Sequence, residues 1–264
     1  MVKPHDRPIN GRVPGSIEEE FGVPIPGRIL PPDQWTQTAI KQFPSPGPIE
    51  WTALFGREAP VVLDLGCGNG RFLIGSALER PELNHLGIDA LPVVIRYARR
   101  RGNQRGLRNL KFAVGGAFEF LRDLVAPSSV REIHCYHPQP YIEPHRASRR
   151  LIQPHFLFYV HRSLEPGGLF VVQTDHPDYW SYMKQIVRYF FEFHEQQGPW
   201  PNHPEGRTRR EIIARKQGLT VYRGYGRALA GLQREEALSA ALRIPMPRFR
   251  ADRRLRLTDQ LERE

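Results

Sequence analysis

Two aspartates and three closely spaced glycines are the residues whose types and spacing most clearly indicate chemistry in this sequence. A short apolar run contains Asp64 and is followed by the turn sequence Gly66-Cys67-Gly68-Asn69-Gly70. Glycines at such a turn let the backbone bend tightly and approach a ligand without an intervening Cβ atom. Asp89 lies 23 residues after Gly66, at the end of the next apolar run, where a carboxylate can accept hydrogen bonds from both ribose hydroxyls of a nucleoside. Together these residues predict a nucleoside cofactor at the carboxyl edge of a sheet.

The spacing of the glycines distinguishes between nucleoside cofactors. Dinucleotide-binding folds use Gly-x-Gly-x-x-Gly and place a pyrophosphate at the N-terminus of the following helix. Here Gly66, Gly68 and Gly70 follow the pattern Gly-x-Gly-x-Gly, and Asp64 precedes the first of them by two residues. A carboxylate there repels a pyrophosphate but suits the positively charged amino acid end of a sulfonium nucleoside. We therefore predict S-adenosylmethionine, with NAD and a purely structural turn as alternatives, and the arrangement resembles the class I methyltransferases.

Alternating strands and helices are predicted to position these residues. The predicted strands are residues 60–65, 85–89, 110–114, 130–136 and 169–174, and the predicted helices are residues 71–80, 92–101 and 150–164. The last helix places Phe156, Leu157, Val160 and Leu164 on one face. Strands and helices that alternate at this spacing indicate a parallel sheet covered on both faces, which is a doubly wound α/β fold.

The sequence divides into three parts by composition. Residues 1–50 contain ten of the 25 prolines, and proline removes a backbone donor and restricts its predecessor, so we expect an extended or partly disordered arm. Trp35 and Phe43 are candidates to pack this arm onto the core. Residues 51–229 form the predicted catalytic domain. Residues 230–264 form an arginine-rich tail, for which a solvated, poorly ordered extension and an RNA-binding arm are both open.

The charge and composition favour a cytoplasmic protein that binds a polyanion. The formal net charge of +10 predicts attraction to nucleic acid first and to an anionic membrane surface second. No apolar stretch reaches the roughly 20 residues that span a bilayer, and the first residues lack the apolar segment of a secretory signal. Cys67 and Cys135 fit reduced core positions, and the four histidines between positions 134 and 155 lack the spacing of a zinc site. Monomer and homodimer both remain open.

Several motifs, spaced in a common order, resemble the bacterial tRNA (guanine-N7-)-methyltransferases. The resemblance covers roughly Ile49 to Tyr225. The matching segments are residues 51–56 with 60–64, residues 81–89, residues 149–157, Gly167-Gly168 with Thr174-Asp175 and Tyr179, and residues 208–211 with Gly218. Several motifs in order are less probable by chance than any one of them. The resemblance implies a mostly parallel seven-stranded sheet with helices on both faces, and methyl transfer from S-adenosylmethionine to guanine N7 in tRNA.

The resemblance also implies roles for individual residues. Those expected to bind the cofactor are Asp64, Gly66, Gly68, Gly70, Asp89, Gly116 and Ala117. Those expected to bind the target guanosine or the RNA backbone are Asp175, Thr208, Arg209, Arg210, Glu211, Arg146, Arg149 and Arg150.

Most of the substrate-binding candidates also have structural alternatives. Asp175 can cap a helix that begins near Pro177, and residues 208–211 can be an ordinary capping box. The three arginines can form a solvated basic face. Three aromatic residues can stack on an extruded base or pack in the core, namely Tyr136, Tyr141 and Trp180.

Three positions depart from the family pattern. Gln139 replaces the aspartate of a Pro-Asp-Pro-Trp sequence, Glu143 replaces a lysine, and Gly116 replaces an aspartate beside the cofactor pocket. Guanine N7 already carries a lone pair, so catalysis is mostly positioning, and a nearby carboxylate stabilises the positive charge that moves onto the purine. Loss of one such electrostatic group typically costs about 3 kcal/mol.

These departures leave the catalytic group and the activity open. Gln139 keeps a carbonyl dipole without the charge, and Glu143 is either a substitute carboxylate or a solvated surface acid. The main prediction is a tRNA (guanine-N7-)-methyltransferase. The alternatives are a diverged methyltransferase with another substrate, and a cofactor- or RNA-binding relative with little or no turnover.

Overall fold

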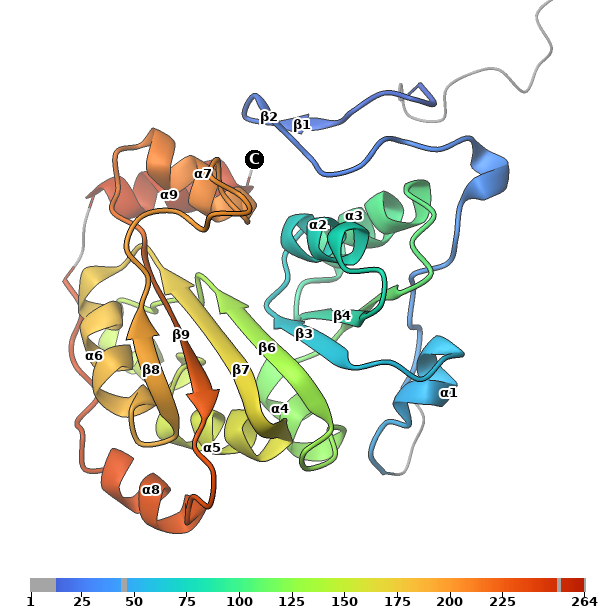
Figure 1. The fold of residues 1–264 in the computed structure, drawn as a ribbon. Coiled ribbons are helices and arrows are strands. Elements are labelled where there is room, and N and C mark those ends of the chain that lie inside the picture. The colour runs from blue at the N-terminus through green and yellow to red at the C-terminus, as the bar shows by residue number, and fades with distance from the viewer. Residues whose placement is uncertain (1–12, 44–46, 251–252, 264) are drawn as a thin grey trace, which may run out of the picture.

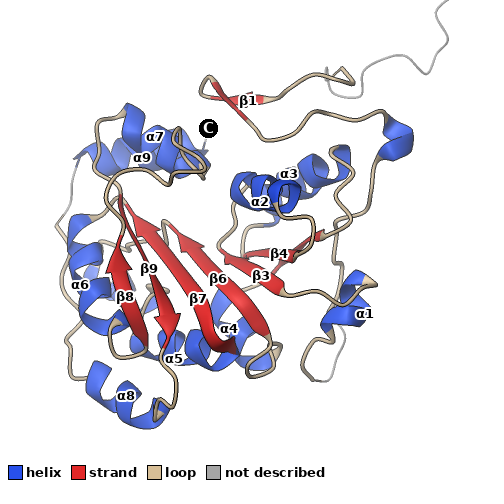
Figure 2. Cartoon of the chain, viewed as in Figure 1, coloured by secondary structure: helices blue, strands red, loops and turns tan. Residues whose placement is uncertain are grey.

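The centre of the molecule is a seven-stranded sheet in the order β5-β4-β3-β6-β7-β9-β8 (Figures 1 and 2). The structure is a computed structural model that describes residues 13–43, 47–250 and 253–263. All neighbouring strands are parallel except β9, which is antiparallel to both β7 and β8. The strands are β3 (Val61–Leu65), β4 (Asn84–Asp89), β5 (Leu110–Val114), β6 (Val130–Tyr136), β7 (Leu164–Thr174), β8 (Phe191–Glu195) and β9 (Tyr222–Ala228). The predicted fold class is confirmed.

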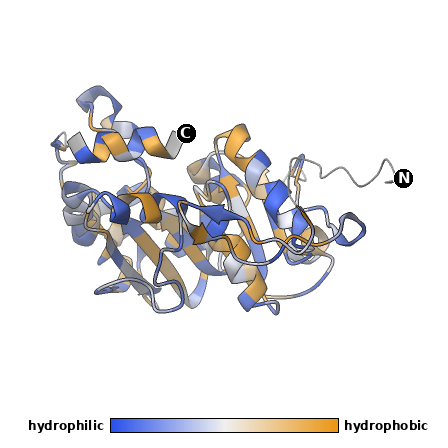
Figure 3. Ribbon diagram, turned by 90° about the horizontal axis from the view of Figure 1, so that it is seen from above, coloured by the Kyte–Doolittle hydropathy of each residue, from blue (hydrophilic) through white to orange (hydrophobic). Residues whose placement is uncertain are grey.

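Helices cover both faces of this sheet. They are α1 (Trp51–Phe55), α2 (Arg71–Glu79), α3 (Pro92–Gln104), α4 (Ala117–Asp123), α5 (Pro154–Ser163), α6 (Pro177–Val187), α7 (Arg209–Lys216), α8 (Arg234–Ala241) and α9 (Arg253–Arg263), with the short 3-10 helices η2 (Pro32–Gln34) and η3 (Pro144–Arg149). Val62 packs in a buried cluster with α2 and α3, whereas its neighbour Leu63 packs in the cluster of α4, α5 and α6. This alternation along β3 places one apolar core on each face of the sheet. Seen from above, hydrophobic residues are concentrated in the strands and their covering helices (Figure 3).

The chain order around β3 creates the edge at which a ligand can bind. The strand after β3 in sequence, β4, pairs on one side of it, and β6 pairs on the other. The loops after β3 and β6 therefore leave in opposite directions. In open α/β sheets, ligands bind in the crevice at such a topological switch point, outside the carboxyl ends of the strands.

The predicted and observed elements differ most where β7 begins, at Leu164 and not at residue 169, and at the start of α5. The prediction placed this helix at residues 150–164, but it begins at Pro154. Gln153 has the extended backbone that a residue before proline prefers, and proline itself suits the first helical position. The segment before it forms η3 instead.

The described part of the arm lies along one edge of the domain. A short hairpin, β1 (Glu19–Glu20) with β2 (Val23–Pro24), is followed by a bridge between Ala39 and Phe112 of edge strand β5. The Phe43 ring packs 5.4 Å from that of Phe120, as expected. Trp35 is half-buried beside α3 and belongs to neither core cluster. Residues 1–12 and 44–46 of the predicted arm lie outside the described residues.

The arginine-rich tail contains helices, so it is not the poorly ordered extension that was one of the two alternatives for it. Its described residues include α8 and α9, and α9 packs beside α7 (Figure 1). Leu255 and Thr258 of α9 are buried. The boundaries drawn at residues 50 and 230 stay predictions. Within the described ranges, every helix is too short or too polar to cross a bilayer.

Candidate cofactor and substrate site

The loop between β3 and α2 exposes its backbone to a ligand. Gly66 and Gly68 have φ angles of 85° and 53°, in the left-handed region, and a Cβ atom at either would meet no other atom within 4 Å. Gly70 is required for close packing, because a Cβ atom there would lie 2.8 Å from the Phe112 ring. The first two glycines thus leave open space above the loop, and the third allows α2 to pack closely.

Asp89 ties this loop to the end of β4. One carboxylate oxygen accepts a hydrogen bond from the Gly68 N–H at 3.0 Å, and the other accepts one from the Leu91 N–H at 2.9 Å. Burial raises the pKa of Asp89, and these two hydrogen bonds partly oppose that rise. The carboxylate therefore lies beside the open glycines, where a ribose would approach.

Asp64 lies in β3 with part of its carboxylate unsatisfied. The side chain is buried, and its Oδ1 atom has no hydrogen-bond partner among the described residues. Burial, and then the nearby charge of Asp89, raise the pKa of Asp64 well above its usual range. A buried carboxylate without a partner is costly, and a cation placed beside it removes that cost. Together with the open glycines, this pair of acids fits a nucleoside that carries positive charge.

The third loop of this edge follows β5. Gly115 donates its N–H to the Asp89 carbonyl at 3.0 Å, and Gly116 caps the N-terminus of α4 with ordinary backbone angles. Ala117 begins α4 and packs against the larger core cluster. The structure thus brings the loops after β3, β4 and β5 together, and with them all the predicted cofactor residues. Their roles in binding remain predictions.

His137 follows β6 and faces the predicted substrate residue Asp175. Its Nδ1 lies 3.4 Å from Asp175 Oδ1, and its Nε2 lies 2.9 Å from the side-chain nitrogen of Gln173. The orientation of the Gln173 amide is fixed, because its oxygen accepts hydrogen bonds from Trp200 Nε1 and Arg223 Nε. An amide nitrogen only donates, so the His137 Nε2 lone pair is occupied. His137 is therefore not available as a general base in this arrangement.

Glu211 is the centre of a buried polar network that the local sequence around it does not indicate. Its Oε1 lies 2.5 Å from Arg223 Nη2, and its Oε2 accepts hydrogen bonds from Gln173 at 3.1 Å and from the Arg207 N–H at 2.9 Å. The Glu211 side chain is fully buried. Gln173 comes from β7, Glu211 from α7 and Arg223 from β9, so the network joins three elements of the site.

The segment from Thr208 to Glu211 is a capping box in this structure. The Thr208 hydroxyl accepts a hydrogen bond from the Glu211 N–H at 3.1 Å and caps α7. The Glu211 carboxylate reaches back to the N–H of Arg207, one residue before the usual partner. The capping alternative therefore accounts for both side chains, and their contact with a guanosine remains a prediction.

Removal of the Thr208 hydroxyl is expected to cost little stability. We expect Thr208→Ala to lower the free energy of unfolding by about 1 kcal/mol, because one N–H at the start of α7 loses its acceptor. Urea unfolding measures the change. Thr208→Ser keeps the hydroxyl and is the matched control, with a loss of less than about 0.5 kcal/mol. A Thr208→Ala protein as stable as the wild type would show that the cap contributes nothing.

Asp175 is buried in an ion-pair cluster and does not cap α6. His176 is the N-cap residue, and its ring accepts the hydrogen bond from the Tyr179 N–H, which corrects the alternative role given to Asp175. Asp175 Oδ2 lies 2.8 Å from Arg210 Nε, and Arg210 also binds Asp259 of α9 at 2.6 Å. Burial alone raises the pKa of Asp175, but His137 and Arg210 together bring it well below its usual range.

The depressed pKa of Asp175 predicts a pH-dependent effect on stability. Because this pKa is lower in the folded than in the unfolded protein, the carboxylate stabilises the fold above the unfolded pKa of about 3.9 and loses that effect as the pH falls. We expect Asp175→Asn to lower stability by about 2 kcal/mol or more at pH 7, and by progressively less as the pH falls from the unfolded pKa toward the lower folded pKa. Urea unfolding at several pH values measures this. A loss that does not change with pH would contradict the assignment.

The structure gives Arg150 a different role from the RNA contact that was predicted for it. Its guanidinium is buried and donates hydrogen bonds to the carbonyl oxygens of Pro140, Tyr141 and Pro247, at 2.6, 3.0 and 2.7 Å. With its donors used in this way, Arg150 supports the loop after β6 and does not face a phosphate. Arg149 is exposed. The guanidinium carbon of Arg146 lies over the Tyr141 ring, 5.0 Å from its centroid.

The departing residues Gln139 and Glu143 both lie on the surface of the loop after β6. Both are exposed, and Glu143 forms the N-cap position of η3.

Tyr136 and Trp180 are buried, which supports the core alternative for these two aromatic residues. Arg209 contacts the arm and tail, with Glu20 at 3.6 Å and the Leu261 carbonyl at 3.2 Å. No group of three metal-ligating side chains occurs in the part of the chain that the structure describes.

Comparison with known proteins identifies the family. Residues 58–224 match the family described as putative methyltransferase. A tRNA (guanine-N(7)-)-methyltransferase of Rubrobacter xylanophilus is 32% identical over 180 residues, 64% of this chain and 77% of that protein. One of Halorhodospira halophila is 31% identical over 192 residues, 71% of this chain and 83% of that protein. The chain belongs to the tRNA (guanine-N(7)-)-methyltransferase family.

Solved structures share the fold of this tRNA (guanine-N(7)-)-methyltransferase family member. The 16S rRNA methyltransferase KamB aligns with a TM-score of 0.52 and 18% identity over 73% of this chain and 98% of that chain. A 16S rRNA (adenine(1408)-N(1))-methyltransferase from Catenulisporales acidiphilia, bound to its cosubstrate, aligns with a TM-score of 0.50 and 14% identity over 72% of this chain and 95% of that chain. The predicted methyltransferase class and its cofactor, S-adenosylmethionine, are confirmed.

Proposed function

We propose that this protein transfers the methyl group of S-adenosylmethionine to N7 of a guanine in tRNA. The observations that carry the proposal are the match of residues 58–224 to the methyltransferase family and the similarity to proteins named tRNA (guanine-N(7)-)-methyltransferase. The cofactor part of it is supported by the open glycines and by the Asp64 oxygen that has no hydrogen-bond partner among the described residues. A tRNA substrate also agrees with the net charge of +10, and we propose a cytoplasmic location with it.

The residues of the first two loops hold and orient the cofactor. When bound, S-adenosylmethionine supplies an electrophilic methyl group on a positively charged sulfur. Asp64 attracts the cationic amino acid end, and Asp89 accepts hydrogen bonds from the ribose hydroxyls. Gly66 and Gly68 let both ends come close to the backbone. Because Asp64 and Asp89 lie on neighbouring strands, they fix the two ends of one ligand.

The residues of the substrate edge act by position and not by removing a proton. Guanine N7 presents a lone pair at neutral pH, so its methylation requires no general base. This agrees with His137, whose Nε2 lone pair is already bound. The network of Glu211, Gln173 and Arg223 holds the ends of β7, α7 and β9 in one arrangement. Rigid placement of the two reacting atoms is worth more here than acid–base chemistry.

Restoring a carboxylate at position 139 is expected to increase methyl transfer. The purine becomes positive as the methyl group arrives, and Gln139 offers only a dipole to that charge. We expect Gln139→Asp to raise kcat about three- to tenfold, since the position is exposed and solvent screens part of the gain. Gln139→Asn shortens the side chain without adding charge and is the control. Equal rates for the two variants would show that charge at this position is unimportant.

Transfer of labelled methyl groups tests the substrate class. Purified protein is incubated with labelled S-adenosylmethionine and with separate fractions of unmodified tRNA, other RNA, protein and small molecules. We expect label only in tRNA. Label in another fraction would favour a diverged methyltransferase, and cofactor binding without any transfer would favour a relative that has lost turnover.

A further inference from the structure

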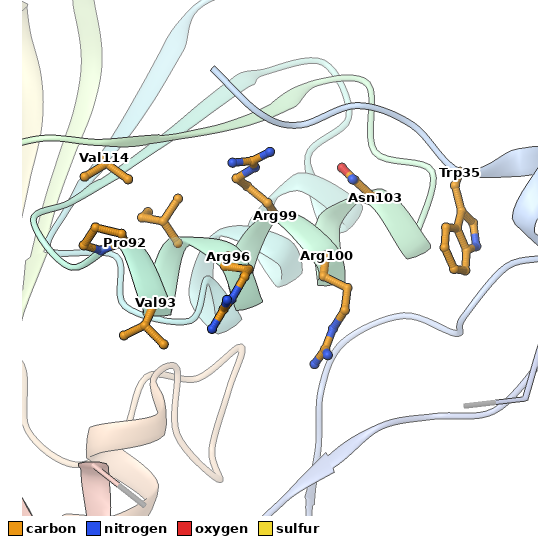
Figure 4. A pocket seen from close by; sticks show the side chains of 9 residues that line it. Trp35, Pro92, Val93, Arg96, Arg99, Arg100, Asn103 and Val114 are labelled. Carbon is orange, nitrogen blue, oxygen red and sulfur yellow. The ribbon is translucent and has the colours of Figure 1, made fainter. Parts of the chain in front are cut away.

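A cavity of about 690 Å³ lies along the outer face of α3, between this helix and the arm. Figure 4 shows the side chains of Arg96, Arg99 and Arg100 projecting from α3, with Pro92 and Val93 at one end of the cavity and Trp35 at the other. We call this feature the α3 groove. Its lining residues are Trp35, Pro92, Val93, Ile95, Arg96, Arg99, Arg100, Asn103 and Val114.

The arginines of α3 divide into two sets with different partners. Arg101 is paired with Glu18 and Glu20 of the arm, at 2.8 and 2.9 Å, and its side chain is buried. Arg96 and Arg99 line the groove, and neither forms an ion pair with a described residue. α3 itself contains no acidic residue that could neutralise them. Within the part of the chain that the structure describes, the positive charges of Arg96 and Arg99 are therefore not balanced by a nearby acid.

One of these arginines has an unsatisfied donor. The Nε atom of Arg99 is buried and has no hydrogen-bond partner among the described residues. Buried donors are normally satisfied by protein, water or a ligand, so this atom of a groove-lining residue is left available for an acceptor. Arginine presents its donors in a planar fork that suits phosphate oxygens.

The groove begins beside the cofactor edge. Pro92 starts α3 three residues after Asp89, and Val114 ends β5 directly before Gly115, which is bonded to Asp89. From there the groove follows α3 toward Trp35. A strand of RNA with one nucleotide at the site can thus continue along α3. The apolar side chains of Pro92, Val93 and Val114 offer a surface for sugar or base, and the arginines offer donors for the backbone.

We propose that the α3 groove binds the phosphate backbone of the RNA substrate at nucleotides other than the methylated guanosine. This inference rests on the proposed function, which identifies the RNA as tRNA. Arg96 and Arg99 each neutralise a phosphate, so the groove adds affinity for tRNA without contacting the cofactor.

Two double variants with the same change in net charge test the proposal. Arg96→Gln/Arg99→Gln removes two charges from the groove. Arg188→Gln/Arg243→Gln removes two exposed arginines near α6 and α8, at the other end of the sheet (Figure 1). Binding of unmodified tRNA by the full chain is measured at several salt concentrations, and S-adenosylmethionine affinity is measured by calorimetry.

The groove variant is expected to bind tRNA at least about tenfold more weakly, with the slope of log K against log salt reduced by roughly 1.4 to 1.8, or 0.7 to 0.9 per phosphate contact. Its cofactor affinity and its kcat at saturating tRNA should equal those of the wild type, while KM for tRNA rises. The control variant should keep its tRNA affinity within about twofold.

Three results would overturn the proposal. Equal losses in both double variants would mean that only total charge matters. Unchanged tRNA binding in the groove variant would leave the groove to another occupant, such as an acidic protein. Loss of cofactor affinity without loss of tRNA affinity would make it part of the cofactor pocket. Failure of the proposed function is distinguishable, because tRNA that is bound through the groove but not methylated at N7 contradicts the function alone.

Discussion

Asp64→Asn is expected to lower the affinity for S-adenosylmethionine about 100-fold while making the cofactor-free protein more stable. The buried Asp64 carboxylate has an oxygen without a hydrogen-bond partner among the described residues, and burial raises its pKa well above the usual range. Its charge is therefore a cost in the free protein that the cationic end of the cofactor removes. The amide that Asp64→Asn introduces has the same shape without the charge, so it avoids the cost of burying that charge. It also loses the attraction to the cationic cofactor, which is worth about 3 kcal/mol for a charged contact.

The sign of the pH dependence follows from the same raised pKa. A carboxyl group whose pKa is higher in the folded than in the unfolded protein makes its stabilising contribution at low pH and loses it as the pH rises through the folded pKa. The stability advantage of Asp64→Asn should therefore grow as the pH rises through that pKa. Cofactor binding to the wild type should also release protons, since a cation favours the ionised form. Calorimetry in buffers of different ionisation enthalpy measures this release, and unfolding at several pH values measures the stability.

A surface acid provides the control for Asp64. Asp123 is exposed and paired with Arg122, so Asp123→Asn should change neither cofactor affinity nor stability by much. A less stable Asp64→Asn protein that still binds the cofactor normally would contradict the role given to Asp64.

Glu211→Ala is expected to lower the free energy of unfolding by about 3–5 kcal/mol. The substitution leaves the Arg223 guanidinium buried without its carboxylate, and removes the acceptor of the Gln173 amide and of the Arg207 N–H. Stability is measured by urea unfolding. Glu211→Gln keeps an acceptor oxygen and should lose less, so it remains measurable if the alanine variant does not fold.

The same experiment separates a structural from a substrate-binding role for Glu211. Glu192→Ala on the exposed side of β8 is the control, with an expected change within about 0.5 kcal/mol. If Glu211 acted only on the guanosine, its replacement by alanine would raise KM for tRNA and leave stability unchanged. That result would contradict the structural role described for the network.

The fold and the cofactor edge were predictable because their signals are local in the sequence. The strands at residues 110–114 and 130–136 have the predicted bounds, since short apolar runs between turn residues specify buried strands. The glycine loop was recognisable because its backbone requirements act within five consecutive residues. Asp89 was predictable from its distance along the chain, which one crossover between parallel strands determines.

The substrate edge was less predictable because its partners are distant in the sequence. Gln173, Trp200 and Arg223 meet in one hydrogen-bonded group, and nothing in their local sequence indicates that they do. The sequence of Thr208 to Glu211 is the same for a helix cap and for a ligand site. Only the inward position of Gln173 in a predicted buried strand signalled that a polar partner was required.

Adjacent arginines show the same limitation at the surface. Arg149 and Arg150 are neighbours of equal charge, but the first is exposed and the second is buried under the carbonyls of its own loop. In α3, Arg101 pairs with acids of the arm about 80 residues away, while Arg99 lines the groove. The net charge of the sequence therefore predicts a polyanionic partner, but it does not predict which arginines contact that partner.

Chemical cleavage of the tRNA product tests the central claim most directly. Methylation at N7 places a positive charge on the guanine ring, so borohydride reduction followed by aniline breaks the chain at the modified nucleotide. We expect tRNA treated with the wild-type protein and S-adenosylmethionine to be cleaved at a guanosine, and tRNA treated with Asp64→Asn at the same limiting cofactor concentration to be cleaved far less. Methyl transfer to tRNA without such cleavage would place the methyl group on another atom and contradict the proposed function.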